Sequence, residues 1–335
     1  MVFKSSLPRQ RRFFIILLAL TLCALVMLTA SILSGSVSLS PSQIFAALTG
    51  SSPEYANIVF ELRLPRALAA FACGGLLALA GAMMQLLLRN PLADPYVLGV
   101  SGGAAVGALC ALLLALPVLQ APLALIGALL STLLVWFGAF GFGKNRPTTS
   151  LSVTSRLLLT GVVIAAGWGA IIVLLLTLAP DAQLRGALTW LMGDLSSVRA
   201  YWPAFVILAF VLVLIWPQAR HLNRLAQGTR YAEALGVPVP RVQLMLYLLA
   251  ALATAAAVVT AGCLPFIGLI VPHALRLMFG NDQRILLPAC VLGGGVFLMF
   301  ADVLARTIAA PYMLPTGVLT ALIGVPVFLF LLRRA

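Results

Sequence analysis

Eight carboxyl groups are the side chains of this sequence best suited to move protons or ions. Ion-coupled transporters hold such groups near the middle of a membrane, where they bind the coupling ion. Asp302 alone lies within an apolar run, and Arg306 follows four residues later on the same helical face. This spacing favours an ion pair or packing near the outer surface, so an ion-coupled secondary transporter is kept only as an alternative. The other seven lie in loops or at expected helix ends: Glu54, Glu61, Asp94, Asp181, Asp194, Glu233 and Asp282.

A short glycine–lysine sequence has part of the pattern of a nucleotide-binding loop. Gly138 is followed by Gly143-Lys144-Asn145. A phosphate loop of the Walker type needs a Ser or Thr hydroxyl after the Lys to ligate magnesium, and it lies between a strand and a helix. Here Asn145 takes the hydroxyl position at the end of an apolar segment. We expect no ATP hydrolysis by this chain and assign no catalytic residue.

The remaining candidates for metal or redox chemistry stand singly. His273 follows Pro272 inside an apolar stretch, which favours a structural hydrogen-bonding role over metal or haem ligation. A membrane-embedded enzyme is not indicated, because the sequence offers no nucleophile paired with a base and no pair of facing carboxylates. We therefore expect neither a metal site nor a cofactor in this chain. The cysteines lie in apolar stretches without metal-ligand spacing: Cys23, Cys73, Cys110, Cys263 and Cys290.

The elements that must hold these residues are apolar. Of the 335 residues, 62% are apolar and 9% are charged, whereas soluble domains carry about 25% charged residues. Runs of about 20 apolar residues, the length that crosses a bilayer, recur throughout. We predict an all-α polytopic membrane protein with one domain over residues 1–335. The ten expected segments are roughly 13–33, 66–88, 96–117, 120–142, 153–179, 200–217, 241–263, 266–280, 285–308 and 315–332.

Charge predicts the orientation of these segments. The formal net charge is +13, and its basic residues lie in short loops. With the N-terminus in the cytoplasm, 16 of the 21 Lys and Arg residues are inside, as the positive-inside rule requires. Both termini are then cytoplasmic and the protein is multi-pass in a bacterial inner membrane. Nucleic-acid binding is not expected, because it needs basic residues gathered on one face. The five external bases are Arg63, Arg66, Arg185, Arg199 and Arg306.

Three segments outside the membrane, and two within it, have distinctive patterns. A short helix is expected after Ser40 in the external segment 34–62, and another in 180–199. The cytoplasmic loop 218–240 predicts a helix–turn–helix, because a helical stretch ends at Gly236 before Pro238.

The eighth membrane segment is short and contains Pro272, which predicts a broken or partial span. In the fifth, small residues recur every four positions and indicate either internal helix packing or a face lining a pathway between two subunits: Gly161, Ala165 and Gly169.

Several strings, taken in order, resemble the FecCD family of ABC importer permeases, which carry iron–siderophores, haem or cobalamin. They cover the chain from about residue 60 to its end. One departure is Met313, where many relatives have Glu. The strings are Arg63-Leu64-Pro65-Arg66, Arg89-Asn90-Pro91-Leu92-Ala93-Asp94-Pro95 with Leu98-Gly99-Val100, Thr154-Ser155-Arg156-Leu157-Leu158-Leu159, Ala234-Leu235-Gly236, Phe266-Ile267-Gly268-Leu269-Ile270-Val271-Pro272-His273, Ala301-Asp302 with Arg306, and Leu314-Pro315-Thr316-Gly317.

This resemblance implies a type II ABC importer permease fold with ten transmembrane helices. It also implies a homodimer around a central pathway, two separate ATPase subunits that bind ATP and magnesium, a periplasmic substrate-binding protein above, and surrounding membrane lipid. Transport would proceed by alternating access. The implied cargo is a large metal chelate, first an iron–siderophore or haem, with cobalamin as the alternative.

The resemblance also implies roles for individual residues. Arg63, Arg66 and Arg306 match arginines that pair with acids on the binding protein, and we expect them to be unpaired cations at the external rim. The other roles follow by matched position: a cytoplasmic gate at Asn90, Leu92, Thr154 and Ser155, pathway lining at Gly161, Ala165 and Gly169, and ATPase coupling within 225–237, at Arg230, Glu233, Ala234, Leu235 and Gly236.

Overall fold

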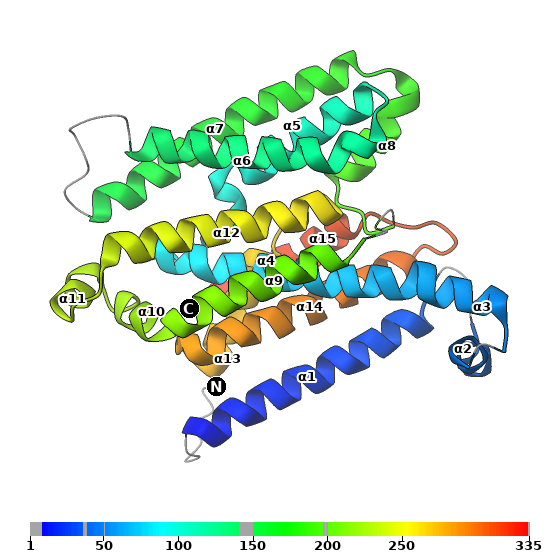
Figure 1. Cartoon of the computed structure of the whole chain (residues 1–335), viewed down its shortest axis with the longest axis horizontal. Coiled ribbons are helices and arrows are strands. Elements are labelled where there is room, and N and C mark those ends of the chain that lie inside the picture. Colours follow the sequence, from blue (N-terminus) through cyan, green and yellow to red (C-terminus); the bar gives the residue numbers. More distant parts are fainter. Residues whose placement is uncertain are drawn as a thin grey trace.

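A computed structural model describes residues 9–35, 39–49, 51–140, 150–196, 198 and 200–333. Each predicted membrane segment coincides with a helix (Figure 1). Seven of these helices belong to continuous helical stretches long and apolar enough to cross a membrane, α9 only by continuing to Leu225, and α5, α13 and α15 are shorter apolar helices. The ten are α1 (Arg9–Leu33), α4 (Leu64–Leu87), α5 (Val100–Leu113), α6 (Gln120–Phe140), α7 (Ser150–Leu178), α9 (Trp202–Ile215), α12 (Val239–Ala261), α13 (Ile267–Phe279), α14 (Gln283–Thr307) and α15 (Thr316–Leu332).

Helix α4 forms the centre of the bundle. It packs against α9, α12, α13 and α14, and nearly all its residues are buried. Its sequence is rich in Ala and Gly, which lets neighbouring backbones approach closely in a membrane. A Cβ atom on Gly74 would lie 2.2 Å from the Gly294 carbonyl oxygen, and one on Gly81 would lie 1.8 Å from that of Gly268. Glycine at these positions therefore sets how closely α14 and α13 approach the centre.

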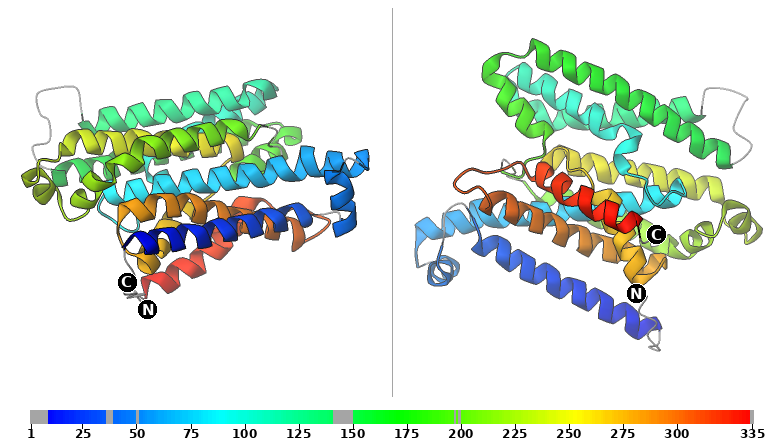
Figure 2. Two further views of the ribbon diagram at one scale, coloured as in Figure 1. Left: turned by 60° about the horizontal axis from the view of Figure 1, so that its bottom comes forward. Right: turned by 180° about the vertical axis from the view of Figure 1, so that it is seen from behind.

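Helices α5, α6 and α7 form a group on one side of α12, and α1 lies on the opposite side of the bundle against α14 (Figures 1 and 2). Both α7 and α1 are peripheral: 17% of the most apolar window of α7 and 11% of that of α1 are buried inside the chain. Since this chain does not cover their apolar side chains, lipid or another subunit must do so.

The predicted irregular eighth segment is confirmed as the 13-residue helix α13, which contains Pro272. A helix of that length spans about 20 Å, less than the roughly 30 Å hydrocarbon layer. The break before it, at 262–266, would expose backbone groups that need partners. The Tyr96 hydroxyl supplies them, accepting from the Leu264 N–H at 2.9 Å and donating to its carbonyl oxygen at 3.2 Å. Tyr96 lies in η2, a single 3-10 turn (Pro95–Leu98).

The helices outside these ten gather at the two ends of the bundle. At one end lie α2 (Pro41–Leu48), α3 (Pro53–Asn57) with the π-helical segment η1 (Ile58–Arg63), and α8 (Asp181–Leu191). At the other lie α10 (Ala219–Leu225) and α11 (Thr229–Ala234), together with both termini (Figure 1). The expected helix after Ser40 is confirmed, because Ser40 and Gln43 form a reciprocal capping box at the start of α2.

Candidate functional site

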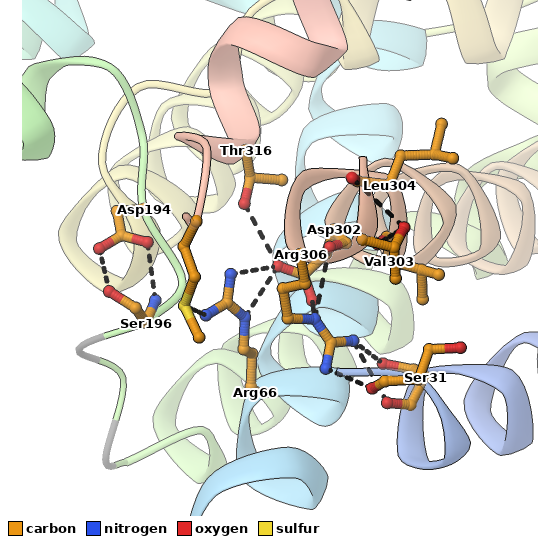
Figure 3. Close-up of polar contacts among 12 residues, drawn as sticks. Ser31, Arg66, Asp194, Ser196, Asp302, Val303, Leu304, Arg306 and Thr316 are labelled. Carbon is orange, nitrogen blue, oxygen red and sulfur yellow. Dashed lines mark hydrogen bonds and ion pairs between the residues drawn. The ribbon is translucent and has the colours of Figure 1, made fainter. Parts of the chain in front are cut away.

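A buried ion cluster joins four helices at the end of the bundle that the charge pattern predicts to be external. The Asp302 carboxylate on α14 is fully buried. It pairs with Arg66 of α4, whose Nε lies 2.9 Å from Oδ1, and with Arg306, whose Nε lies 3.0 Å from Oδ2. The Thr316 hydroxyl at the start of α15 donates to Oδ1 at 3.2 Å (Figure 3). One carboxylate thus holds α4, α14 and α15 together.

Two arginines also form hydrogen bonds with the end of α1, the fourth helix of the cluster. The Arg306 guanidinium donates to the Ser31 hydroxyl at 2.8 Å and to the Ser34 carbonyl at 3.0 Å. Arg63 donates to the carbonyls of Ile32 and Leu33 at 2.7 and 3.0 Å. The last carbonyls of a helix lack partners within it, and arginine side chains satisfy them here. These contacts fix the end of α1 to the ion cluster.

The expectation of three unpaired cations on an open rim is wrong. Arg63, Arg66 and Arg306 are 5%, 6% and 3% exposed, and each has partners within the chain. The reason is that Asp302 takes two arginines rather than one, and helix carbonyls take the remaining donors. Docking of a binding protein through these arginines stays a prediction. The exposed charges that the structure describes on this end include Glu54, Glu61, Asp181 and Arg185.

The predicted gate residues lie on two segments, the loop after α4 and the start of α7. Asn90 shapes the loop after α4: its side-chain oxygen accepts the Leu92 N–H at 2.9 Å. Leu92 is left exposed, and the loop then leads into η2, which packs against α7. Ser155 is exposed near the start of α7, whereas the side chain of Thr154 falls outside the described residues. The gate stays a prediction.

The proposed pathway face of α7 divides between two environments. A Cβ atom on Gly161 would lie 2.2 Å from the Val97 carbonyl oxygen, so Gly161 is buried against η2. The Ala165 backbone lies beside Gly99, at 3.5 Å from a Cβ atom built there. For Gly161 the internal-packing interpretation is correct, because η2 rather than an open pathway lies beside it. Ala165 is half-buried, and its pathway role stays a prediction. Gly169 faces open space, with no atom within 4 Å of its Cβ position.

The helix pair α10 and α11, which the charge pattern predicts to be cytoplasmic, has one buried and one exposed face. Leu222, Leu225 and Ala232 are buried and anchor α10 and α11 to the bundle. Gly236 ends the pair at φ +75°, a conformation that L-residues adopt at a cost. The predicted coupling residues are exposed beside these anchors: Arg230, Glu233, Ala234, Leu235 and Gly236.

The sequence matches relatives over nearly its whole length. The profile of the FecCD transport family matches residues 22–334. The vitamin B12 import system permease protein BtuC of Vibrio cholerae is 40% identical, with 99% of this chain and 96% of the relative covered. The hemin transport system permease protein HmuU of Yersinia pestis is 41% identical, with 90% of each chain covered.

The chain belongs to the FecCD transport family.

The fold agrees with this membership. A metal-chelate type ABC transporter solved in an inward-facing conformation superposes with a TM-score of 0.83 at 28% identity, covering 96% of this chain and 99% of that one. The predicted all-α type II importer permease fold is therefore confirmed. This FecCD chain is a multi-pass permease of the inner membrane, and ATPase and binding-protein partners follow from that class of transporter.

The sequence-based prediction misses one contact of this FecCD chain and is wrong about another residue. Asn223 of α10 donates to Asp282 Oδ1 at 2.8 Å and accepts the Gln283 N–H at 2.8 Å, and so ties α10 to the start of α14. No local pattern predicts it, since the partners are about 60 residues away. The hydrogen-bonding role expected of His273 is wrong: the ring is buried, and neither nitrogen has a partner among the described residues.

Proposed function

We propose that two copies of this chain form the pathway of an ABC importer for a large metal chelate, an iron–siderophore or haem. Two separate ATPase subunits would dock on the cytoplasmic helices, and a periplasmic binding protein would deliver the cargo. ATP and magnesium would bind to the ATPases. The chain would supply the path and the two gates, and no catalytic group.

The observation that carries this proposal is the exposed face of α10 and α11. Buried Leu222 and Leu225 hold the pair rigidly against the bundle, while exposed Arg230, Glu233 and Leu235 have the mixed charged and apolar character of a protein interface. Leu235 is 45% exposed although it lies at the cytoplasmic end, beyond the membrane. A separate ATPase subunit gives these side chains a partner.

Cobalamin is the second candidate cargo. Relatives named for haem and for vitamin B12 import match this chain with similar identity. Both cargoes hold a metal within a tetrapyrrole-type macrocycle, and a path wide enough for cobalamin would also pass the smaller haem. Specificity would rest on the binding protein, because a path of small and apolar residues offers few directional contacts.

Transport would alternate between two access states, with the loop of Asn90 and Leu92 closing against the start of α7 at Thr154 and Ser155. ATP must favour one state by differential binding. At the external end the binding protein would dock on the surface that includes α2, α3 and α8. Arg63, Arg66 and Arg306 would act from beneath it, fixing the helix ends that carry this surface.

Uptake in reconstituted vesicles tests the proposal. The chain is reconstituted with candidate ATPase and binding-protein subunits, and ATP-dependent uptake of haem, a ferric siderophore and cobalamin is measured in parallel. We expect uptake of one chelate class only when all three protein components are present. Uptake driven by an ion gradient without the ATPase would instead establish a secondary transporter.

A further inference from the structure

A cavity of about 540 Å³ opens at the cytoplasmic end of the bundle. Its walls come from the start of α1, the turn η4 (Trp216–Gln218) with the start of α10, and the start of α14. These segments lie at the same end as α11 and both termini (Figure 1). The volume is within the range of about 300–1,000 Å³ typical of ligand sites, and no function so far described uses it.

The polar side of the cavity carries excess positive charge. Arg220 and Arg284 line it together with Asp282. The Asp282 carboxylate already accepts hydrogen bonds from Asn223 and from the Arg284 backbone N–H, as the cap of α14. Within the described chain, neither arginine side chain forms an ion pair. The cavity therefore presents two guanidinium groups to an anion.

The apolar side of the cavity continues along the outer face of α1. Phe13 and Phe14 line the cavity, and Phe14 is 69% exposed. Exposed leucines follow it at helical spacing on the same face: Leu18, Leu22 and Leu25. Trp216 lines the cavity and donates its indole N–H to the Arg284 carbonyl at 3.1 Å. An amphipathic tryptophan beside arginines marks the level of the lipid headgroups.

We propose that this cavity binds an anionic phospholipid of the cytoplasmic leaflet. The phosphate would lie between Arg220 and Arg284, since guanidinium groups bind phosphate oxygens in pairs. An acyl chain would follow Phe14 and the exposed leucines of α1. A soluble anion would contact the arginines but not the exposed leucines of α1. A zwitterionic lipid would add the positive charge of its own headgroup to a site that is already basic. Basic pockets between membrane helices on the cytoplasmic side bind anionic headgroups in general.

Fluorescence quenching at Trp216 measures this binding. The full chain is reconstituted in vesicles containing either brominated phosphatidylglycerol or brominated phosphatidylcholine, and the Trp216 contribution is the difference between wild type and Trp216→Phe. We expect phosphatidylglycerol to be preferred roughly tenfold, and a variant with Arg220→Gln and Arg284→Gln to lower that preference to about twofold or less. The matched control is Arg241→Gln, an exposed cytoplasmic arginine at the start of α12 that should keep the preference.

Three results would overturn the proposal. Equal quenching by the two lipids in the wild type would mean an unselective apolar groove. An equal loss in the Arg241→Gln control would mean a general effect of surface charge. Relief of the phosphatidylglycerol quenching by excess inorganic phosphate would mean a site for a soluble anion. Thermal unfolding of every variant is measured alongside, and a lost preference counts only where the unfolding midpoint is unchanged; if the double variant unfolds early, Arg220→Gln and Arg284→Gln are tested singly.

Discussion

At the external end Asp302 pairs with Arg66 and Arg306 beneath the surface, whereas at the cytoplasmic end Arg230 and Glu233 are exposed on α11. The two regions contain the same types of residue next to the same kind of membrane helix. The external charges complete contacts between helices of one chain, and the cytoplasmic charges are available to another protein. Position in a loop or at a helix end therefore does not distinguish an anchor from an interface, and burial does.

The largest expected effect is the loss of the external anchor. Asp302→Ala leaves Arg66 and Arg306 buried beside each other without a carboxylate, which should reduce the free energy of unfolding by about 3–5 kcal/mol. Thermal or denaturant unfolding in detergent measures it. Asp181→Ala, at an exposed external carboxylate on α8, is the control and should change little. A stable Asp302→Ala variant would show that the cluster does not hold the helices together.

Changes beside the exposed residues of α11 should affect transport rather than stability. Gly236→Val forces a branched side chain into a backbone conformation with φ +75°, although the space around it is open, and should distort the end of α11. ATP-driven uptake should then fall roughly tenfold, while the ATPase either continues to hydrolyse ATP or dissociates from the chain. Gly280→Val is the matched control, since Gly280 has φ +90° and equally open surroundings away from α11. Equal loss of uptake in both variants would assign the effect to backbone strain alone.

A smaller effect is expected at the proposed gate. Ser155→Trp adds bulk to an exposed position near the start of α7 and should lower uptake severalfold without changing assembly with the ATPase. Thr177→Trp places the same side chain at an exposed position near the other end of α7 and is the control. Unchanged uptake by the Ser155→Trp variant, with Thr154→Trp behaving alike, would remove the gate from this position.

The smallest expected effect separates anchoring from docking at Arg63. Arg63→Gln removes a guanidinium that bonds the carbonyls of Ile32 and Leu33, and should cost about 1 kcal/mol of stability. If anchoring is its whole role, affinity for the binding protein should not change and its dependence on salt should equal that of the wild type. A weaker and less salt-sensitive complex would favour the docking role. Charge reversal at Arg66 is unsuitable as a docking test, because Arg66→Glu would place a second carboxylate beside the buried Asp302.

The sequence predicts those features that local patterns determine. Apolar length predicts the membrane helices, Ser40 with its capping partner predicts α2, and Pro272 predicts the short α13. Local patterns do not predict the partners of the arginines, because Arg66 and Asp302 are 236 residues apart in the sequence. Gly161 shows the same limit: small residues at four-residue spacing predict a close contact but not whether η2 or another subunit makes it. Contacts of this kind depend on the packing of the whole bundle.

The bonds at both ends of α14 have a mechanical consequence. Asn223 holds the start of the helix to α10, Asp302 holds its far end to α4, and between them Gly294 rests directly on Gly74. Along the helix, the Gly294 contact lies about 16 Å from the first bond and about 12 Å from the second. Because α14 is fixed to its neighbours at these three points, a displacement that begins at α10 should move α14 and α4 together as one body.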